Sequence, residues 1–275
     1  MEPFAIEVNG VSHTFGRGGP NEVTALHAVD LAIEPGAFVV VFGPNGSGKS
    51  TLLSAVAGDF VPDRGSIRVG GVDVTRRPAH ERARVIGRVS QEPALGTAPS
   101  LTVAENLALA GGRAASRRGL RAALSARTRH DLADRVAGLS MGLEDRLDTP
   151  MAQLSGGQRQ ALALLMATLV RPEVLLLDEH MAALDPRSAE DVLRLTHEMI
   201  VRDRLTVLMV SHSMQQVVRL GDRAVMIHRG RIVHDFSGAR KRRLRAEELL
   251  DCFEAVRNAD LLDDAAAGML ARAYV

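Results

Sequence analysis

The chain has 275 residues, and its 34 basic and 33 acidic residues leave a net charge of only +1. That length suits one large or two small domains with a buried core, and the charge balance excludes a protein that works mainly by coating nucleic acid. A single cysteine excludes a disulfide framework, and the longest apolar stretch, Ala161 to Val170, is about half of the ~20 residues that a membrane helix needs.

The beginning of the chain predicts a small antiparallel sheet, because short segments alternate apolar and polar residues. The segments are Ala5–Val8, Leu31–Ile33 and Ser66–Val69, and turns are expected at Asn9-Gly10, Glu34-Pro35-Gly36 and Gly70-Gly71.

Four apolar runs without polar alternation predict buried parallel strands, since helices then cover both faces of the sheet. They are Phe38–Phe42, Val85–Ser90, Val174–Leu177 and Thr206–Val210. Helical patterns lie near them, at Ser50–Ala57, Ser155–Val170, Ser188–Arg202 and Met214–Leu220. Strands that alternate with helices predict an α/β fold.

Two further regions favour helices without strands. Thr102–Ala110 and Arg121–Ala137 read as helices joined by an arginine-rich link, which predicts a helical insert in the α/β core. The link contains Arg113, Arg117, Arg118 and Arg121. After Gly238 the chain is first basic and then predicts an amphipathic helix around Leu249, Leu250, Phe253 and Val256.

A glycine-rich motif with the pattern G-x-x-x-x-G-K-S separates the first apolar strand from the helix that follows it. Its residues are Gly43, Pro44, Asn45, Gly46, Ser47, Gly48, Lys49 and Ser50, with Thr51 next. Such loops let backbone N–H groups surround phosphate oxygens, while the lysine reaches the β- and γ-phosphates and the hydroxyl ligates Mg²⁺. The alternative is a glycine-rich turn that happens to contain a lysine. Lys49 is one of only two lysines in the chain, which argues against a chance match.

An acidic pair, Asp178-Glu179, follows the strand Val174–Leu177. The first carboxylate can hold a Mg²⁺ ion and the second can orient or deprotonate an attacking water. Taken alone, an Asp-Glu pair here would be an ordinary strand end. Together with the phosphate loop it predicts hydrolysis of a phosphoanhydride.

A third motif, Leu154-Ser155-Gly156-Gly157-Gln158, opens a long apolar helix. Ser155 is a natural N-cap and the two glycines leave backbone N–H groups bare, so the motif predicts a second anion-binding helix start. Taken together, the three motifs resemble the ATP-binding-cassette (ABC) ATPases, whose signature is this Leu-Ser-Gly-Gly-Gln. The resemblance extends from Ile6 to about Phe236.

The resemblance assigns roles to other residues that are weak signals alone. Phe15 matches an aromatic that stacks on adenine, and Gln91 matches a glutamine that contacts Mg²⁺ and senses the γ-phosphate. Ala183-Leu184-Asp185 matches a loop that links the two sites of a dimer, and His212 matches a histidine that contacts the γ-phosphate. By themselves, Gln91 reads as a solvated residue and His212 as a structural one.

The family's fold is a P-loop NTPase, with a RecA-like parallel sheet, a flanking antiparallel β subdomain and an inserted α-helical subdomain. The resemblance implies a catalytic core split between residues 1–91 and 171–238. It also implies a helical subdomain at 92–170 that carries the signature, and a C-terminal extension at 239–275.

The resemblance also implies an ATPase that uses ATP and Mg²⁺ and powers transport across a membrane. Lys49, Gln91, Glu179 and His212 would be catalytic, and Ser50, Gln91 and Asp178 would surround the metal. The nucleotide would also contact Phe15, the loop from Gly43 to Thr51, and the signature from Ser155 to Gln158.

Several partners follow from the same resemblance. They are a second copy or paralogous cassette in a head-to-tail dimer, integral-membrane permease subunits and, indirectly, an extracellular solute-binding protein, with no nucleic acid. The expected location is the cytoplasmic face of a bacterial plasma membrane, and the start Met1-Glu2-Pro3 is no secretory signal.

The chain departs from the family after the acidic pair, where His180-Met181 replaces the usual Pro-Thr. We interpret His180 as a tolerated loop variant rather than a catalytic group. The segment from Leu176 to Pro186 resembles importer ATPases that are paired with branched-chain-amino-acid-type permeases and aromatic-amino-acid binding proteins. The function expected is therefore import of a small solute such as an amino acid.

Other classes share some of these motifs. A small-molecule kinase would have the phosphate loop without the signature, and a DNA-repair ATPase would add long coiled coils or zinc hooks. An exporter ATPase and a soluble assembly ATPase of the iron–sulfur scaffold type remain alternatives.

Overall fold

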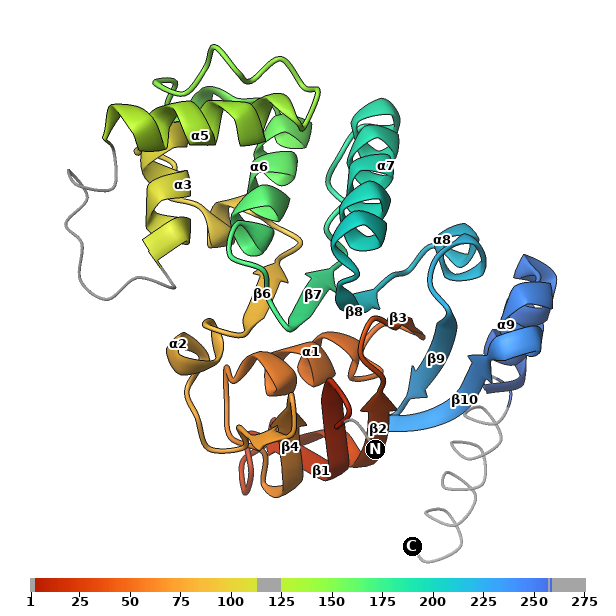
Figure 1. Cartoon of the computed structure of the whole chain (residues 1–275). Helices are drawn as coiled ribbons and strands as arrows, with labels where there is room; N and C mark the ends of the chain where they lie inside the picture. Colours follow the sequence, from red (N-terminus) through yellow and green to blue (C-terminus); the bar gives the residue numbers. More distant parts are fainter. Residues whose placement is uncertain (1–2, 113–124, 257, 259–275) are drawn as a thin grey trace, which may run out of the picture.

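The computed structural model describes residues 3–112, 125–256 and 258, which form two sheets and the helices around them (Figure 1). The larger sheet has the order β10-β9-β3-β8-β7-β6 and is parallel except for β10, which pairs antiparallel with β9. Its strands are β3 (Phe38–Phe42), β6 (Ile86–Val89), β7 (Val174–Asp178), β8 (Thr206–Val210), β9 (Arg223–His228) and β10 (Arg231–Ser237).

The smaller sheet is antiparallel, with the order β2-β1-β4-β5. Its strands are β1 (Ile6–Phe15), β2 (Val23–Ile33), β4 (Arg64–Val69) and β5 (Val72–Asp73). The prediction of a small antiparallel sheet beside a parallel one is confirmed.

The central strands are apolar throughout because both of their faces are covered. In β3, Val40 and Phe42 point into one hydrophobic cluster, whereas Val39 and Val41 point into a second one. The first cluster is shared with the helices α6 (Gly156–Thr168) and α7 (Pro186–Asp203). The second joins the two sheets through α1 (Lys49–Ala57).

The helix α6 also packs against α3 (Val103–Gly111), which packs against α5 (Ala126–Ala137), and in Figure 1 these three lie together above the sheets. The remaining described helices are α2 (Ala79–Arg82), α8 (Met214–Arg219), α9 (Gly238–Arg243) and residues 246–256. No helix in the described ranges combines the length and the apolarity needed to cross a bilayer.

The predicted strands of the parallel sheet and the predicted helices are present, and their ends shift by at most two residues, except at the start of the helix predicted from Arg121. The helix predicted from Ser188 begins at Pro186, and the one predicted to Val170 ends at Thr168. The helix predicted from Arg121 begins at Ala126 as α5. Residues 113–124, which contain the arginines of the predicted link, lie outside the described residues.

The turn predicted at Asn9-Gly10 is wrong. Strand β1 continues through it to Phe15, and its register with β2 shifts between Val8 and Val11. Gly10 has a φ of 59° and donates its N–H to Asp30 Oδ1 at 2.7 Å, so the glycine bends the strand without ending it.

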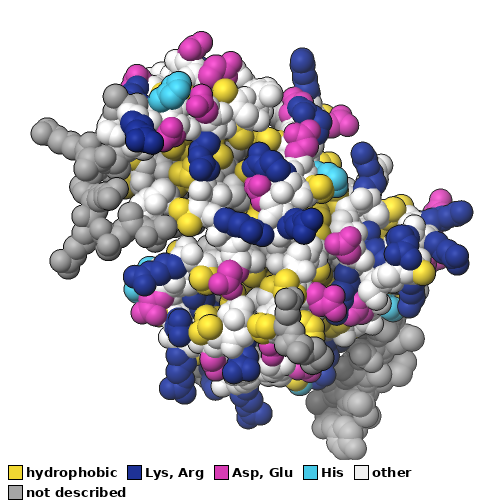
Figure 2. All heavy atoms as spheres, in the orientation of Figure 1, with side chains coloured by type: hydrophobic (Ala, Val, Ile, Leu, Met, Phe, Trp, Pro, Cys, Tyr) yellow, Lys and Arg dark blue, Asp and Glu magenta, His cyan; other side chains and the backbone are white. Residues whose placement is uncertain are grey.

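The surface carries both signs of charge. Figure 2 shows Lys and Arg side chains interspersed with Asp and Glu side chains on the face in view, as the net charge of +1 leads one to expect.

Candidate nucleotide-binding site

Four groups that the sequence singles out follow the carboxyl ends of adjacent parallel strands. The phosphate loop follows β3, Asp178 ends β7, Gln91 follows β6 and His212 follows β8. The sheet order places these strand ends side by side. Ligands of open α/β sheets bind at this edge, so the fold brings the predicted groups to one site.

The phosphate loop has a backbone that only glycine can provide. Gly43 and Gly48 have φ values of 149° and 106°. A Cβ at Gly43 would lie 2.1 Å from the Ile227 carbonyl oxygen, and one at Gly48 would lie 2.4 Å from that of Ala25. The Ser47 hydroxyl is buried with no hydrogen-bond partner among the described residues. A buried polar atom without a partner fits a loop that is shaped for an external phosphate.

Lys49 is buried at the start of α1, and its ammonium donates to the carbonyl oxygens of Gly43 at 3.0 Å and Pro44 at 2.8 Å. Burial lowers the pKa of this ammonium, and the nearby carboxylates of Glu179 and Asp178 oppose the shift. A phosphate in the loop would offer charged acceptors in place of the two carbonyls.

Ser50 and Asp178 come together although they are far apart in the sequence. The Ser50 hydroxyl donates to Asp178 Oδ1 at 3.2 Å. Hard oxygen donors of this kind suit Mg²⁺, which usually takes one or two protein ligands and completes its shell with water and phosphate. Within the described ranges no cluster of three or more His, Cys, Asp or Glu side chains is placed to hold a metal.

Glu179 and His212 are in direct contact, through Glu179 Oε1 and His212 Nε2. The Glu179 side chain is mostly buried, at 12% exposure, and its backbone has a left-handed φ of 44°. Its N–H donates to the Val210 carbonyl at 3.2 Å, which ties the end of β7 to β8. A carboxylate and an imidazole therefore meet beside the phosphate loop.

His180 is fully buried and does not face this edge as a free group. Its Nε2 lies 3.3 Å from Thr196 Oγ1, and the Thr196 hydroxyl itself donates to the Val192 carbonyl at 2.7 Å. The imidazole must then donate through Nε2, so Nδ1 carries no proton. Burial lowers the pKa of His180 to about 4. These contacts support the interpretation of His180 as a loop residue rather than a catalytic one.

The buried imidazole predicts acid sensitivity of the fold. Between about pH 6.5 and pH 4 the unfolded chain binds a proton at His180 that the folded chain excludes, so the free energy of unfolding falls as the pH falls. We expect His180 to lower the free energy of unfolding by about 2 kcal/mol between about pH 7.5 and pH 5. At still lower pH its contribution approaches a limit of about 3 kcal/mol. Urea unfolding of the wild type and of His180→Phe measures the difference.

His197→Phe, exposed on α7 directly after Thr196, is the matched control for loss of a histidine. Equal pH dependence of unfolding in the wild type and in His180→Phe would contradict the assignment of this acid sensitivity to His180.

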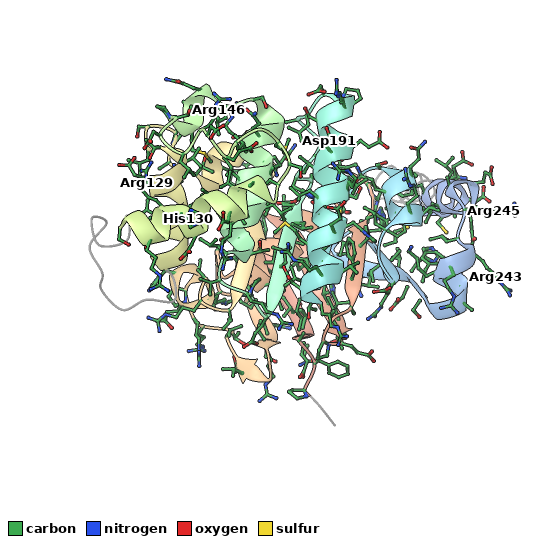
Figure 3. All side chains as sticks on the ribbon, turned by 45° about the horizontal axis from the view of Figure 1, so that its top comes forward. Arg129, His130, Arg146, Asp191, Arg243 and Arg245 are labelled. Carbon is green, nitrogen blue, oxygen red and sulfur yellow. The ribbon has the colours of Figure 1, made fainter. Side chains whose placement is uncertain are left out.

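Ser155 caps α6, and its hydroxyl accepts the Gln158 N–H at 3.2 Å. Gln158 Oε1 in turn accepts from the Ser155 N–H at 3.2 Å and from Arg146, which Figure 3 labels in the helical region, at 3.3 Å. A Cβ at Gly157 would lie 2.8 Å from Ser188 Cβ, so α6 packs tightly on α7. The Gln158 side chain is thus engaged within the chain, while the backbone N–H groups of the helix start suit an anion.

The helix start of α6 belongs to the helical group above the sheets in Figure 1, whereas the phosphate loop lies among the strands. The two elements that the sequence predicts to bind anions therefore lie in different parts of the described structure.

Phe15 is half-exposed at the end of β1, and Gln91 is exposed directly after β6. Phe15 pairs with Val23, two residues before Ala25, whose carbonyl closes on Gly48. At ~3.3 Å per residue and ~4.8 Å between strands, Phe15 lies roughly 8 Å from Ala25. The backbone of Phe15 is therefore near the part of β2 that packs on the phosphate loop at Gly48.

Two residues of this region are missed by the sequence analysis. The first is Arg146, whose guanidinium donates to Gln158 Oε1. Gln160 is fully buried in α6 and its amide donates to the carbonyl of Ser90, directly before Gln91, at 3.5 Å. The signal for Gln160 is a polar residue in the apolar run of a helix that is buried on several sides.

Comparison with known proteins gives consistent matches. A family model described as ABC transporter matches residues 26–182. The chain is 39% identical to the tyrosine transport ATP-binding protein of Clostridioides difficile (strain R20291), over 90% of this chain and 98% of that protein. It is 38% identical to an aliphatic sulfonates import ATP-binding protein of Nocardia farcinica (strain IFM 10152), over 85% of this chain and 82% of that protein.

Solved structures give the same picture. A bacterial ABC transporter cassette with a dimeric structure shares 27% identity and a TM-score of 0.72, over 84% of this chain and 98% of that chain. A dimeric cassette in a post-hydrolysis state with ADP and Pi shares 26% identity and a TM-score of 0.70, with the same coverage.

Proposed function

This chain belongs to the ABC transporter family of ATP-binding proteins, and from that membership we propose that it powers the import of a small solute, specifically an amino acid, through a separate permease. As an ATPase of this family it binds and hydrolyses ATP. The observation that carries the ATPase part of the proposal is the contact between Glu179 and His212 beside the phosphate loop and the Ser50–Asp178 pair.

The proposed chemistry assigns one task to each group. Lys49 leaves the carbonyl oxygens of its own loop and binds the β- and γ-phosphates, while the loop N–H groups hold the remaining oxygens. Glu179 accepts the proton of the attacking water, and His212 contacts the γ-phosphate while it orients Glu179. Ser50, Asp178 and Gln91 would hold Mg²⁺, which when bound supplies charge neutralisation at the phosphates.

A second cassette would complete the site. The start of α6 offers the backbone N–H groups of Gly156 and Gly157, because the Ser155 N–H is already bonded to Gln158 Oε1. In a head-to-tail dimer, these groups would bind the γ-phosphate held by the partner's loop. Two dimeric structures of one related cassette support this arrangement.

We propose that the chain divides into a catalytic core of residues 1–91 and 171–238, a helical subdomain of residues 92–170 and a C-terminal extension of residues 239–275. The helices α3, α5 and α6 all lie within residues 92–170, and α3 packs against both α5 and α6. This supports residues 92 and 170 as the limits of the helical subdomain.

The permease would bind the face of this helical group that lies next to Gln91. A cavity of about 270 Å³ opens between β6, the segment after it, α3 and α6. Its lining combines Ser90 and Glu92 on either side of Gln91 with the half-exposed Leu109. A short permease helix in this cavity would touch the segment that carries Gln91, and this would couple nucleotide binding to the membrane.

The amino-acid cargo is the finer part of the proposal. It rests on the tyrosine transport relative, which aligns over 98% of its own length and 90% of this chain. It also rests on the His180-Met181 variant of the loop after Glu179. An importer of this kind would receive its cargo from an extracellular solute-binding protein.

Uptake of labelled tyrosine by cells that lack the gene tests the proposal. We expect uptake to fall and to be restored by the wild-type gene but not by Glu179→Gln. Leu109→Asp should also fail to restore uptake, because a charge in the cavity opposes an apolar helix, while the purified variant hydrolyses ATP like the wild type. Unchanged tyrosine uptake in the deletion strain would contradict the cargo, and full restoration by Leu109→Asp would contradict the docking surface.

A further inference from the structure

The His13 imidazole contacts two phenylalanine rings at the end of β1, Phe15 and Phe60, which also meet each other edge-on at 5.6 Å and 74°. It stacks on Phe60, with ring centroids 4.0 Å apart and planes 19° apart, and it meets Phe15 edge-on at 4.6 Å and 88°. The His13 side chain is 12% exposed, whereas Phe15 is 45% exposed. Phe60 packs in turn on the hydrophobic cluster that joins the two sheets. The exposed ring of Phe15 therefore rests on a buried support.

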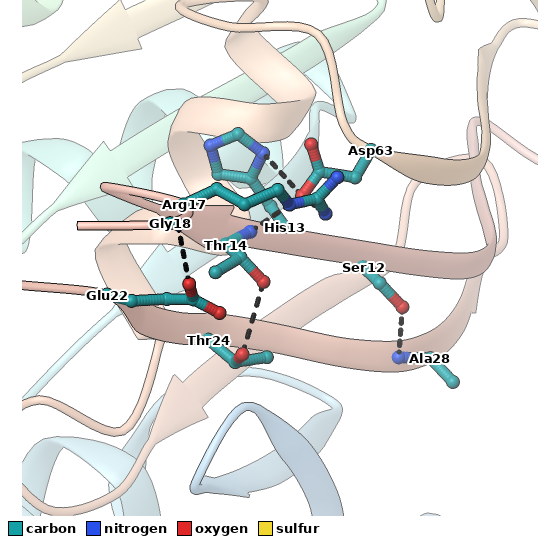
Figure 4. Close-up of polar contacts among 9 residues, drawn as sticks. All are labelled: Ser12, His13, Thr14, Arg17, Gly18, Glu22, Thr24, Ala28 and Asp63. Atoms are coloured by element: carbon teal, nitrogen blue, oxygen red, sulfur yellow. Dashed lines mark hydrogen bonds and ion pairs between the residues drawn. The ribbon is translucent and has the colours of Figure 1, made fainter.

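A carboxylate fastens this support to β1. Figure 4 shows Asp63 accepting the Thr14 N–H at 2.8 Å and the Arg17 guanidinium at 2.9 Å, with His13 Nδ1 at 3.7 Å. The Asp63 N–H also donates to the Ser12 carbonyl at 2.9 Å. Asp63 thus holds the backbone on both sides of His13.

The other side of β1 is fastened to β2 in the same view. The hydroxyls of Thr14 and Thr24 are hydrogen-bonded at 3.1 Å, and the Gly18 N–H donates to Glu22 Oε2 at 2.7 Å, which closes the loop between the two strands (Figure 4). The position of Phe15 is therefore fixed from two directions.

Two of the residues that support Phe15, Phe60 and Asp63, lie in the segment that follows the phosphate loop and α1. Lys49 begins α1, Gly58 ends it, and Phe60 and Asp63 follow within the next few residues. The N-terminal end of α1 thus faces the phosphates, and the segment after its C-terminal end carries the support for Phe15. One helix sets the separation between the two parts of the nucleotide site.

We propose that His13, backed by Phe60 and held by Asp63, is a positioning residue that keeps the Phe15 ring oriented to stack on the base of the bound nucleotide. The proposal rests on the nucleotide site described under the proposed function. An edge-on aromatic contact stabilises one ring orientation, and stacking on a base requires that orientation to be present before binding. Removing His13 leaves Phe60 as the only one of the two supporting rings in contact with Phe15, so the Phe15 ring is less well oriented and base contacts weaken, while the triphosphate contacts to Lys49 and the loop remain.

Comparison of ATP with inorganic tripolyphosphate, which has no base, separates the two sets of contacts. We expect His13→Ala to weaken ATP binding by about three- to tenfold and to leave tripolyphosphate binding unchanged. The KM for ATP should rise with kcat unchanged at saturation. His13→Phe keeps a ring on Phe60 and should restore ATP affinity, and His130→Ala, on the exposed side of α5, is the control for loss of a histidine.

Phe15→Ala should weaken ATP binding at least as much as His13→Ala, and the double variant should be no weaker than Phe15→Ala alone, because His13 acts through Phe15. Phe60→Leu leaves His13 in place and should give the same base-dependent loss, which provides a second test if His13→Ala folds poorly.

Equal weakening of ATP and tripolyphosphate by His13→Ala and by Phe60→Leu would overturn the proposal, because it would indicate a general effect on the fold. An additive double variant, or no loss of ATP affinity in either variant, would also overturn it. Failure of the nucleotide site itself looks different, since the wild type would then bind neither ligand, or Lys49→Ala would leave both affinities unchanged.

Discussion

Glu179→Gln is expected to bind ATP like the wild type and to hydrolyse it about 10²- to 10⁴-fold more slowly, because glutamine cannot accept the proton of the attacking water. Glutamine keeps the size of the side chain and can still contact His212, so the loss falls on the chemical step alone. Phosphate release under single-turnover conditions measures the rate, and equilibrium binding of ATP measures the affinity.

The same variant should accumulate as a dimer with ATP, because nucleotide that is not hydrolysed keeps the two cassettes together. Light scattering with and without ATP gives the mass. Asp191→Asn, an exposed acidic residue on α7, is the control for the loss of a carboxylate. Retention of most of the hydrolytic rate in Glu179→Gln would show that another group activates the water.

Lys49→Ala should weaken ATP binding by at least about 100-fold, since two charge-assisted contacts to phosphate oxygens are each worth about 1.5–3 kcal/mol. Its ammonium is held at the start of α1 by the carbonyl oxygens of Gly43 and Pro44, so no rearrangement of the backbone is needed for it to face a phosphate. Isothermal titration with a slowly hydrolysed ATP analogue measures the affinity.

Lys241, the other lysine of the chain, provides a contrast. It is buried and donates to the Val218 carbonyl at 3.0 Å, away from the phosphate loop. Lys241→Met should lower the stability of the fold but leave ATP affinity within about twofold of the wild type at a temperature where it is folded. Equal ATP affinity of Lys49→Ala and the wild type would contradict the phosphate-loop assignment.

The phosphate loop could be predicted from the sequence because its function dictates residue type at each position. Gly43 and Gly48 need a backbone and a space that exclude a Cβ, and Lys49 needs a compact charge. The central strands could also be predicted, since a strand buried on both faces is apolar at every position.

Other features depend on contacts between distant segments. The contact of Glu179 with His212 requires β7 and β8 to be neighbours, and the support of Phe15 by Phe60 and Asp63 requires the segment after α1 to return to β1. Spacing along the chain carries no information on either. The contact of Gln158 with nucleotide stays a prediction, and its side chain completes the cap of α6, a role that the same sequence pattern allows.

Strands at the edges of the sheets are the hardest elements to predict from the sequence. In β10 only Phe236 is fully buried and most other residues are exposed or half-exposed, so the strand lacks the apolar run that marks β3. The continuation of β1 past Gly10 is hidden for a related reason, because an Asn-Gly pair indicates a turn as readily as it indicates a bend within a strand.

The central claim is that this chain hydrolyses ATP at the site built from the phosphate loop, Asp178 and Glu179. Steady-state phosphate release by the purified wild type, measured beside Lys49→Ala and Glu179→Gln with ATP and Mg²⁺, tests it most directly. We expect saturable phosphate release by the wild type and background release by both variants. Of the two variants, only Glu179→Gln should still bind ATP like the wild type. Equal rates of release from all three proteins would contradict it.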